Sequence, residues 1–90
     1  MGTYKFLMKD GSIRVTHNIK KFGEERGVKE LDWTRLNTLK FRYFDKDSFE
    51  FLKKFGLEPT EFNICCFQLL GCVHLYDGQI EKLKAGGFIE

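Results

Sequence analysis

The sequence contains little alanine, serine or proline. Alanine occurs once, at Ala85, proline once, at Pro59, and serine twice, whereas phenylalanine occurs ten times in 90 residues. Alanine and serine are normally among the commonest residues of globular proteins. The bias is typical of AT-rich coding, as in phages and some low-GC microbes, and we expect a phage-encoded protein.

Long apolar runs are also absent. No stretch approaches the roughly 20 apolar residues that span a bilayer, and the chain does not open with the charged and then apolar segments of a signal peptide. The three cysteines cannot all pair within one chain, and two of them are adjacent, which makes a poor disulfide framework. We therefore expect a cytoplasmic protein with reduced thiols and no membrane contact.

The motifs that carry catalysis or bind phosphorylated cofactors are missing as well. The sequence has no Ser-centred nucleophile elbow, no Walker loop and no G-x-G-x-x-G. Its carboxylates do not form a paired acid and base. The glycines of "KAGGF" follow a predicted helix instead of opening one, so they do not suit a phosphate. We expect no enzymatic activity and no cofactor.

The segment "FNICCFQLLGCVHL" holds four potential zinc ligands, which are Cys65, Cys66, Cys72 and His74. Adjacent residues on a helix point about 100° apart, so Cys65 and Cys66 cannot readily hold one ion, and the usual C-x₂₋₄-C spacing is absent. Apolar neighbours raise the pKa of a thiol. We predict that the cysteines pack in the core and hold no metal; a zinc site and a reactive thiol are the alternatives.

What is present indicates one globular domain over residues 1–90, with 42% hydrophobic residues. The net charge of +2 conceals an asymmetry. Residues 1–44 carry ten Lys or Arg against five Asp or Glu, and residues 45–90 carry five against eight. Such a split suits a basic face that meets an anionic partner, or two halves of one domain that attract each other.

The clearest local pattern is the hairpin in "TYKFLMKDGSIRVTH". Asp10-Gly11 is a typical two-residue turn. This turn pairs Met8 with Ile13 and Phe6 with Val15, and it directs these side chains to the core face because the side-chain period of a strand is two. A third strand is expected in the alternating "TLKFRYF", residues 38–44.

Apolar spacing and capping residues predict the remaining elements. Asn18, Asp32, Asp45 or Asp47, and Asp77 are the expected N-caps, and Gly56 and Gly71 the expected helix ends. Phe88 and Ile89 are expected to dock on the core. The result is an α+β fold in which the hairpin and one or two further strands form a small antiparallel sheet against three to four helices. The predicted helices lie within residues 18–30, 45–56, 59–70 and 78–85. Residues 31–39 are ambiguous and could form one helical turn, and residues 72–75 form a short strand or link.

The outward side of the predicted sheet is basic. In the predicted register its positions include five basic residues and no acidic one. A solvated sheet with lysines along its edge is the alternative without a function. We predict a surface that contacts an acidic protein or phosphates, formed by Lys5, Arg14, Lys40 and Arg42 and extended by Lys20, Lys21 and Arg26.

The stretch "LEPTEFNICCFQLLGCVHLYDGQIEKL" resembles the start of the winged-helix DNA-binding domain of OmpR/PhoB-type response regulators. The shared features are a Leu-x-Pro-Thr-Glu-Phe helix start at residues 57–62, a short Gly-x-Val strand at residues 71–73, and a helix with Gln79 and Ile80. The resemblance implies a helix-turn-helix-like unit. It stops before the recognition helix and wing, so no DNA-reading residues carry over.

Three functions remain open from the sequence. We expect a small non-enzymatic adaptor or inhibitor that docks on a larger protein through the basic face. Direct binding of nucleic acid, by a unit like a truncated winged helix, is the alternative. A zinc- or thiol-dependent enzyme is the third hypothesis.

Overall fold

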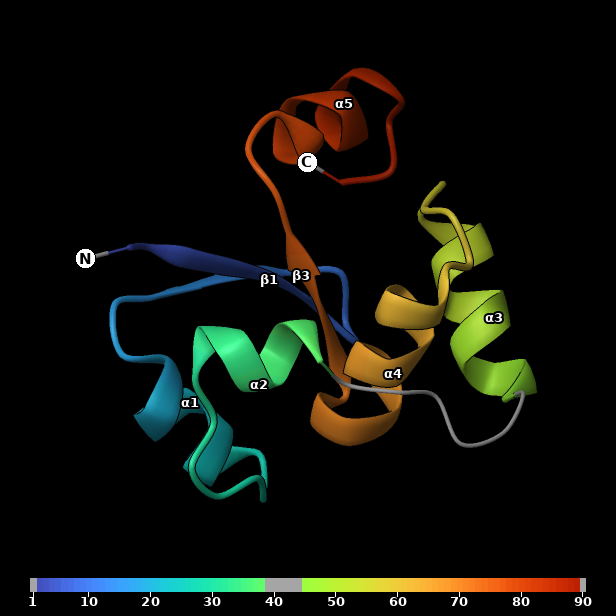
Figure 1. The fold of residues 1–90 in the computed structure, drawn as a ribbon. Helices are drawn as coiled ribbons and strands as arrows, with labels where there is room; N and C mark the ends of the chain where they lie inside the picture. The colour runs from blue at the N-terminus through green and yellow to red at the C-terminus, as the bar shows by residue number, and fades with distance from the viewer. Residues whose placement is uncertain (1, 39–44, 90) are drawn as a thin grey trace.

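The computed structural model describes residues 2–38 and 45–89 (Figure 1). The chain folds as an α+β protein, as the sequence predicted. The strands are β1 (Tyr4–Met8), β2 (Ile13–Thr16) and β3 (Cys72–Leu75), and the helices are α1 (Ile19–Glu25), α2 (Trp33–Asn37), α3 (Lys46–Lys54), α4 (Glu61–Leu70) and α5 (Gln79–Ala85).

The strands form one antiparallel sheet in the order β2-β1-β3. The predicted strand over residues 72–75 is therefore confirmed, and it pairs with β1 through Lys5–Leu75 and Leu7–Val73. The other predicted strand, residues 38–44, falls almost wholly outside the described residues. Its first residue, Thr38, caps the C-terminal end of α2.

The hairpin is confirmed, but its predicted register is wrong by one residue. Leu7 pairs with Ile13 and Phe6 with Arg14. The loop has three residues instead of two, because the Met8 N–H donates to the Ser12 carbonyl at 2.8 Å and the Gly11 N–H donates to the Met8 carbonyl at 2.9 Å. Gly11 has a φ of 90°, as the left-handed residue of such loops requires.

The side chain of Asp10 explains the longer loop. Its Oδ1 accepts hydrogen bonds from the backbone N–H of Ser12 at 2.9 Å and from the Ser12 hydroxyl at 2.6 Å. The Ser12 N–H is thereby withdrawn from the strand pairing that a two-residue loop would need. A shift of one residue moves every β2 side chain to the opposite face.

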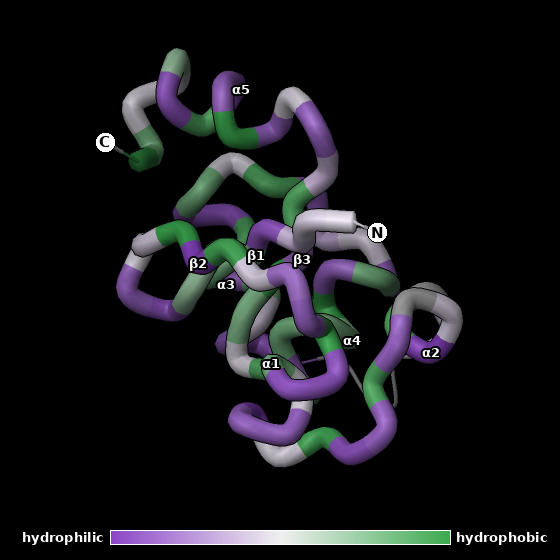
Figure 2. The backbone as a smooth tube through the Cα atoms, turned by 90° about the vertical axis from the view of Figure 1, so that its left-hand side faces the viewer, coloured by the Kyte–Doolittle hydropathy of each residue, from purple (hydrophilic) through white to green (hydrophobic). Residues whose placement is uncertain are grey.

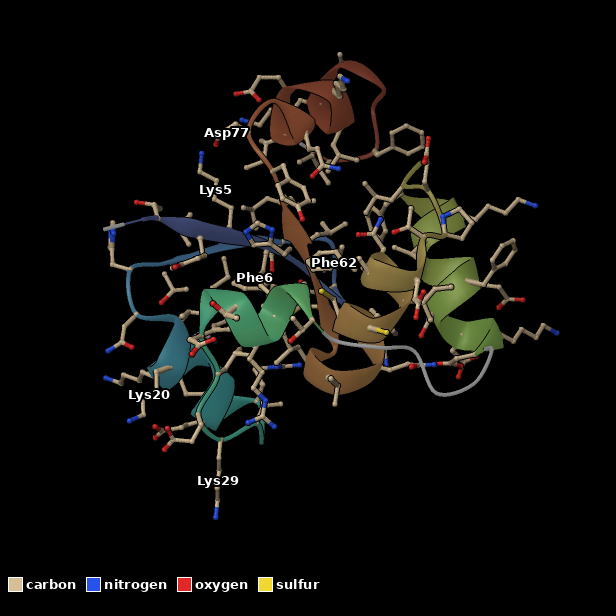
Figure 3. The ribbon with its side chains drawn as sticks, viewed as in Figure 1. Lys5, Phe6, Lys20, Lys29, Phe62 and Asp77 are labelled. Carbon is tan, nitrogen blue, oxygen red and sulfur yellow. The ribbon has the colours of Figure 1, made fainter. Side chains whose placement is uncertain are left out.

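The new register gives the sheet two distinct faces. Figure 3 shows Lys5 and Phe6 extending from opposite sides of β1. Cross-strand pairing places one set of side chains on the Phe6 face and the other on the Leu7 face. The Phe6 face carries Tyr4, Phe6, Met8, Arg14, Thr16, Cys72 and His74, and the Leu7 face carries Lys5, Leu7, Ile13, Val15, Val73 and Leu75.

Helices cover both faces. Phe22 of α1 stacks on Phe6 with ring centroids 4.3 Å apart, and Leu36 of α2 belongs to the same cluster. Phe51 of α3 and Leu83 of α5 pack on the opposite side. In Figure 1, α1 and α2 accordingly lie below the sheet and α5 above it. The expectation of an open, polar sheet face is therefore wrong.

Helix α4 packs along β3 and contributes to both clusters, through Cys66 and Leu70 on one side and Ile64 on the other. It is the buried central helix that the sequence predicted, and it ends at Gly71, which has a φ of 70°. Its N-cap is Thr60, one residue after the predicted Pro59 start, and the Thr60 hydroxyl accepts the Asn63 N–H at 3.1 Å. Within residues 2–38 and 45–89, no helix is long and apolar enough to cross a membrane.

The predicted N-caps of α1, α2 and α3 are confirmed, whereas the predicted Asp77 cap of α5 is wrong, because the N-cap of that helix is Gly78 and no side chain caps it. Asn18 accepts the N–H of Lys21, Asp32 that of Arg35, and Asp45 that of Asp47. Each side chain satisfies a backbone donor that the first helical turn leaves without a partner in the helix. The Asn18 cap fixes where α1 begins, directly after β2. It therefore determines which basic side chains of α1 lie beside the edge of the sheet.

Candidate interaction surface

The structure separates the predicted basic residues. Lys5 lies on the Leu7 face and Arg14 on the Phe6 face, so they do not form one patch. Lys20 and Lys21 are exposed on α1, and Figure 3 shows Lys20 extending outward from it. Lys40 and Arg42 lie outside the described residues. A binding role for any of these side chains stays a prediction.

Arg14 is held in place by two contacts. Its Nη2 donates to the Glu25 carboxylate at 2.5 and 2.9 Å, and its guanidinium carbon lies 5.1 Å from the centroid of the Phe22 ring. The ion pair is solvent-exposed, so it contributes at most about 1 kcal/mol to stability. The packing on Phe22 orients the guanidinium across the end of β2.

Arg26 contacts the C-terminal end of α4. Its Nε donates to the Leu70 carbonyl at 2.6 Å, and a Cβ on Gly71 would lie 2.6 Å from its Nη2. Carbonyls at a helix C-terminus lack helical partners and attract cations. Arg26 therefore has a structural role that the sequence did not indicate, because its partner is 44 residues away along the chain.

Arg14 and Arg26 together line an open depression of about 510 Å³ beside β2. Lys9 lines it too. Hydrogen bonds from Ser12 keep the pKa of the Asp10 carboxyl below its ordinary value, so this neighbour is ionised at neutral pH. The depression thus has three cations at its rim against the carboxylates of Asp10 and Glu25.

A second hollow of about 700 Å³ lies at the same hairpin end and is mainly apolar. Ile13 of β2 lines it together with Phe55, Ile80, Phe88 and Ile89. The two hollows share Asp10, Ser12 and Ile13 at the hairpin. Beyond it, the basic depression extends to Arg14 on the Phe6 face, and the apolar hollow extends to Ile80 and Ile89, which pack on the Leu7-face cluster. The docking of Ile89 on the core is confirmed, because it packs on the Leu7-face cluster.

The edge of the sheet lies between these two hollows. No strand in residues 2–38 or 45–89 pairs with the outer side of β2. The hydrogen bond from Met8 to Ser12 marks the hydrogen-bonded pairs of this antiparallel ladder, which alternate along it. The N–H and C=O groups of Ile13 and Val15 therefore point away from β1. The sequence did not identify this edge, because it did not show on which side of the hairpin a further strand joins.

The cysteine cluster is part of the core, as predicted. Cys65, Cys66 and Cys72 are reduced and at most 1% exposed. Burial raises the pKa values of the Cys66 and Cys72 thiols to about 12, which leaves almost no thiolate at neutral pH. In the part of the chain that the structure describes, no three His, Cys, Asp or Glu side chains are grouped closely enough to hold a metal ion.

His74 is buried on the Phe6 face among aromatic rings. Its ring centroid lies 4.9 Å from that of Tyr76 and 5.4 Å from that of Phe6, both nearly perpendicular. Tyr4 and Phe62 are 6.2 and 6.5 Å away. Burial lowers the pKa of His74 to about 4, against an opposing effect of Asp77, so the ring is neutral at pH 7.

A third hollow, of about 520 Å³, separates α5 from the start of α4. Phe62, Tyr76 and Phe88 supply aromatic rings to it, and Glu58 and Lys82 supply opposite charges. Phe62, one of these lining residues, is labelled in Figure 3. The mixture of charges favours neither an anion nor a cation, and the sequence did not predict this hollow because its walls come from three separate segments.

No protein-family model, no curated protein and no solved structure matches this chain. The helix–strand–helix order that the response-regulator resemblance implies is present in α4, β3 and α5. With no family match to support it, the resemblance adds no functional residue, and the candidate surface depends on its own geometry.

Proposed function

We propose that this chain is a small non-enzymatic binding protein, an adaptor or inhibitor that docks on a larger protein in the cytoplasm. The observation that supports it is the β2 edge, defined as Ile13–Thr16 with the basic depression on one side and the apolar hollow on the other. In the proposed complex, Arg14 and Lys9 face acidic groups of the partner. The alanine-poor composition supports a phage origin.

Charge and apolar area have separate roles in this proposal. The basic rim accelerates encounter with an acidic partner and orients it. Burial of apolar surface supplies most of the favourable free energy of association, of which only the surplus over the ordering costs appears as affinity. Val15, a large aliphatic side chain on the edge, is 52% exposed and belongs to the surface that docking would cover.

Site-specific crosslinking tests the proposal. A photoreactive amino acid replaces Val15 in one variant and the exposed Lys53 of α3 in a control, and both are incubated with lysate of the source cells. We expect a protein adduct from position 15 that is absent from position 53 and is lost on Arg14→Glu. Equal adducts from both positions, or an adduct indifferent to Arg14→Glu, contradict the proposal.

A salt series distinguishes a protein partner from a nucleic acid. Each phosphate contact on duplex DNA contributes roughly −0.9 to the slope of log K against log salt. Under the proposal, random DNA and RNA are not shifted in a gel at 50 mM salt and the crosslinked adduct resists nuclease. A steeply salt-dependent shift, with an adduct that nuclease removes, assigns the surface to nucleic acid and overturns the proposal.

A further inference from the structure

We propose that the β2 edge binds one extended segment of the partner as a fourth strand of the sheet, and that this segment alternates aliphatic and acidic side chains. The inference rests on the proposed function and specifies the partner's chemistry. Addition of a strand to an exposed sheet edge is a general mode of peptide recognition, in which backbone hydrogen bonds hold the strand and alternate side chains select it.

The first step is the backbone. The N–H and C=O groups of Ile13 and Val15 point outward, so a strand beside β2 forms its hydrogen-bonded pairs opposite these two residues. Figure 2 shows β2 as the outer strand of the three, with α5 and the C-terminal segment on one side and α1 on the other. The edge is short, four residues, so it accommodates a short segment.

The second step is the side chains. In a strand added to β2, the residues opposite Ile13 and Val15 point to the Leu7 face, where Ile13, Ile80 and Ile89 line the apolar hollow. The residue opposite Arg14 points to the other face, where Arg14, Arg26 and Lys9 line the basic depression. A partner segment with an aliphatic, an acidic and an aliphatic residue in succession therefore directs its apolar side chains to the apolar hollow and its carboxylate to the basic depression.

A second copy of the same chain fits this edge less well. A twofold antiparallel pairing of β2 with β2 places both Arg14 side chains on the same face of the joined sheet, within one or two positions of each other. Like charges at such distances are destabilising. The Lys9 side chain favours an acidic segment instead, and so does Arg14, whose exposed ion pair with Glu25 a carboxylate of the partner replaces.

A synthetic peptide tests the inference directly. The probe is an eight-residue capped peptide in which valine and glutamate alternate, and the control has the same composition with the valines and glutamates in two blocks. We expect the alternating peptide to bind about tenfold or more tightly than the block peptide. We also expect the amide protons of Ile13 and Val15 to exchange more slowly with solvent when it is bound. Equal binding of the two peptides, or unchanged exchange at both amides, overturns the inference.

Two blocking changes probe the backbone hydrogen bonds. Val15→Pro removes an outward N–H, and proline is tolerated at an edge position of this kind; Val15→Thr is the matched control. If Val15→Pro unfolds the chain, N-methylation of the peptide at alternate residues gives the same test on the unaltered protein. Either block is expected to weaken binding about tenfold or more. Binding that persists through N-methylation contradicts strand addition.

The crosslinking assay separates the two proposals. With the photoreactive residue at position 15, Ile13→Pro is the backbone block, because the Ile13 N–H also points outward. An adduct that Arg14→Glu abolishes and Ile13→Pro leaves intact supports docking on the basic rim and overturns strand addition. An adduct indifferent to both changes overturns the proposed function itself. Sedimentation of the protein alone at increasing concentration tests for a second copy at this edge, and we expect a monomer. A dimer that Val15→Pro dissociates would assign the edge to a second copy and overturn the inference.

Discussion

β2 and β3 are both four-residue strands, and both pair with β1 in antiparallel fashion, yet their surroundings differ completely. All four residues of β3 are buried, whereas none of β2 is. The difference lies in the helix that follows or precedes each strand. α4 packs along β3, while α1 turns under the sheet after β2, and no strand of residues 2–38 or 45–89 pairs with the outer side of β2.

The comparison teaches where stability and recognition reside in a small sheet. β3 is an edge strand by topology, but its side chains are part of both core clusters. β2 keeps outward-pointing backbone groups, which natural proteins usually protect with charge or cover. Here a single arginine and a short strand length serve that purpose, and the open edge becomes the proposed binding surface.

Cysteine labelling should show the largest difference between the two strands. The pKa of about 12 leaves the Cys72 thiol roughly a thousandfold less ionised than a thiol at the ordinary value of 9.0. In a Val15→Cys variant at pH 8, we expect the new thiol to react with a maleimide about a thousandfold faster than Cys66 and Cys72. Urea-unfolded protein, in which all four react quickly, is the control. Rapid labelling of the native thiols in the folded state would instead support the reactive-thiol alternative.

Truncation of an aliphatic side chain tests the same contrast in stability. Leu75 is 3% exposed, and Leu75→Ala should lower the free energy of unfolding by about 2–5 kcal/mol because it leaves a cavity on the Leu7 face. The matched change in β2, Val15→Ala, should cost less than about 0.5 kcal/mol. Urea denaturation measures both. Similar costs at the two positions would mean that β2 is covered in solution.

His74 makes the stability of the β3 region sensitive to acid. The pKa of His74 is about 4 in the folded chain against an ordinary value of 6.5. Between these pH values the unfolded chain binds a proton that the folded chain does not. The contribution of His74 to the free energy of unfolding is therefore complete above pH 6.5 and decreases as the pH falls from 6.5 to 4. Below pH 4 it levels off, with a total loss of about 3 kcal/mol.

His74→Phe isolates this effect because the site is aromatic on four sides. We expect the variant to lose less stability than the natural chain between pH 6.5 and pH 4, and the difference between the two curves measures the contribution of His74. His17→Phe, at an exposed position on the link after β2, is the control. Parallel pH curves for the natural chain and His74→Phe would show that the ring titrates alike in both states.

The smallest effect is expected at the Arg14–Glu25 ion pair beside β2. Both side chains are more than a third exposed, so a double-mutant cycle of Arg14→Gln and Glu25→Gln should give a coupling of about 0.2–1 kcal/mol that declines with salt. A coupling above about 2 kcal/mol would indicate a desolvated pair, and hence an edge less open than described.

Local patterns in the sequence predicted much of the fold. Asn18, Asp32 and Asp45 were correctly assigned as N-caps, and Gly56 and Gly71 as helix ends, because capping depends on residues within one turn. The existence of the β1–β2 hairpin followed from the turn signal for the same reason. Its register did not, since Asp10 bonds Ser12 and adds one residue to the loop.

The candidate surface was predictable only in part. Arg14 was identified as a surface cation, but its pairing with Glu25 and its position on the Phe6 face depend on that register. The contact of Arg26 with Leu70 joins residues 44 apart. The apolar hollow joins the hairpin, the end of α3 and the C-terminal residues, and no local pattern links such distant segments.

The sequence by itself determined the α+β class, the caps that bound most helices, and the burial of the cysteines, because these follow from neighbouring residues and from the apolar character of the "FNICCFQLL" segment. Only the tertiary structure decided which strand is buried and which, within the described residues, has no strand on its outer side. That choice depends on where α4 and α1 pack against the sheet, and it is set by contacts between side chains far apart in the chain. It places the proposed binding surface at β2.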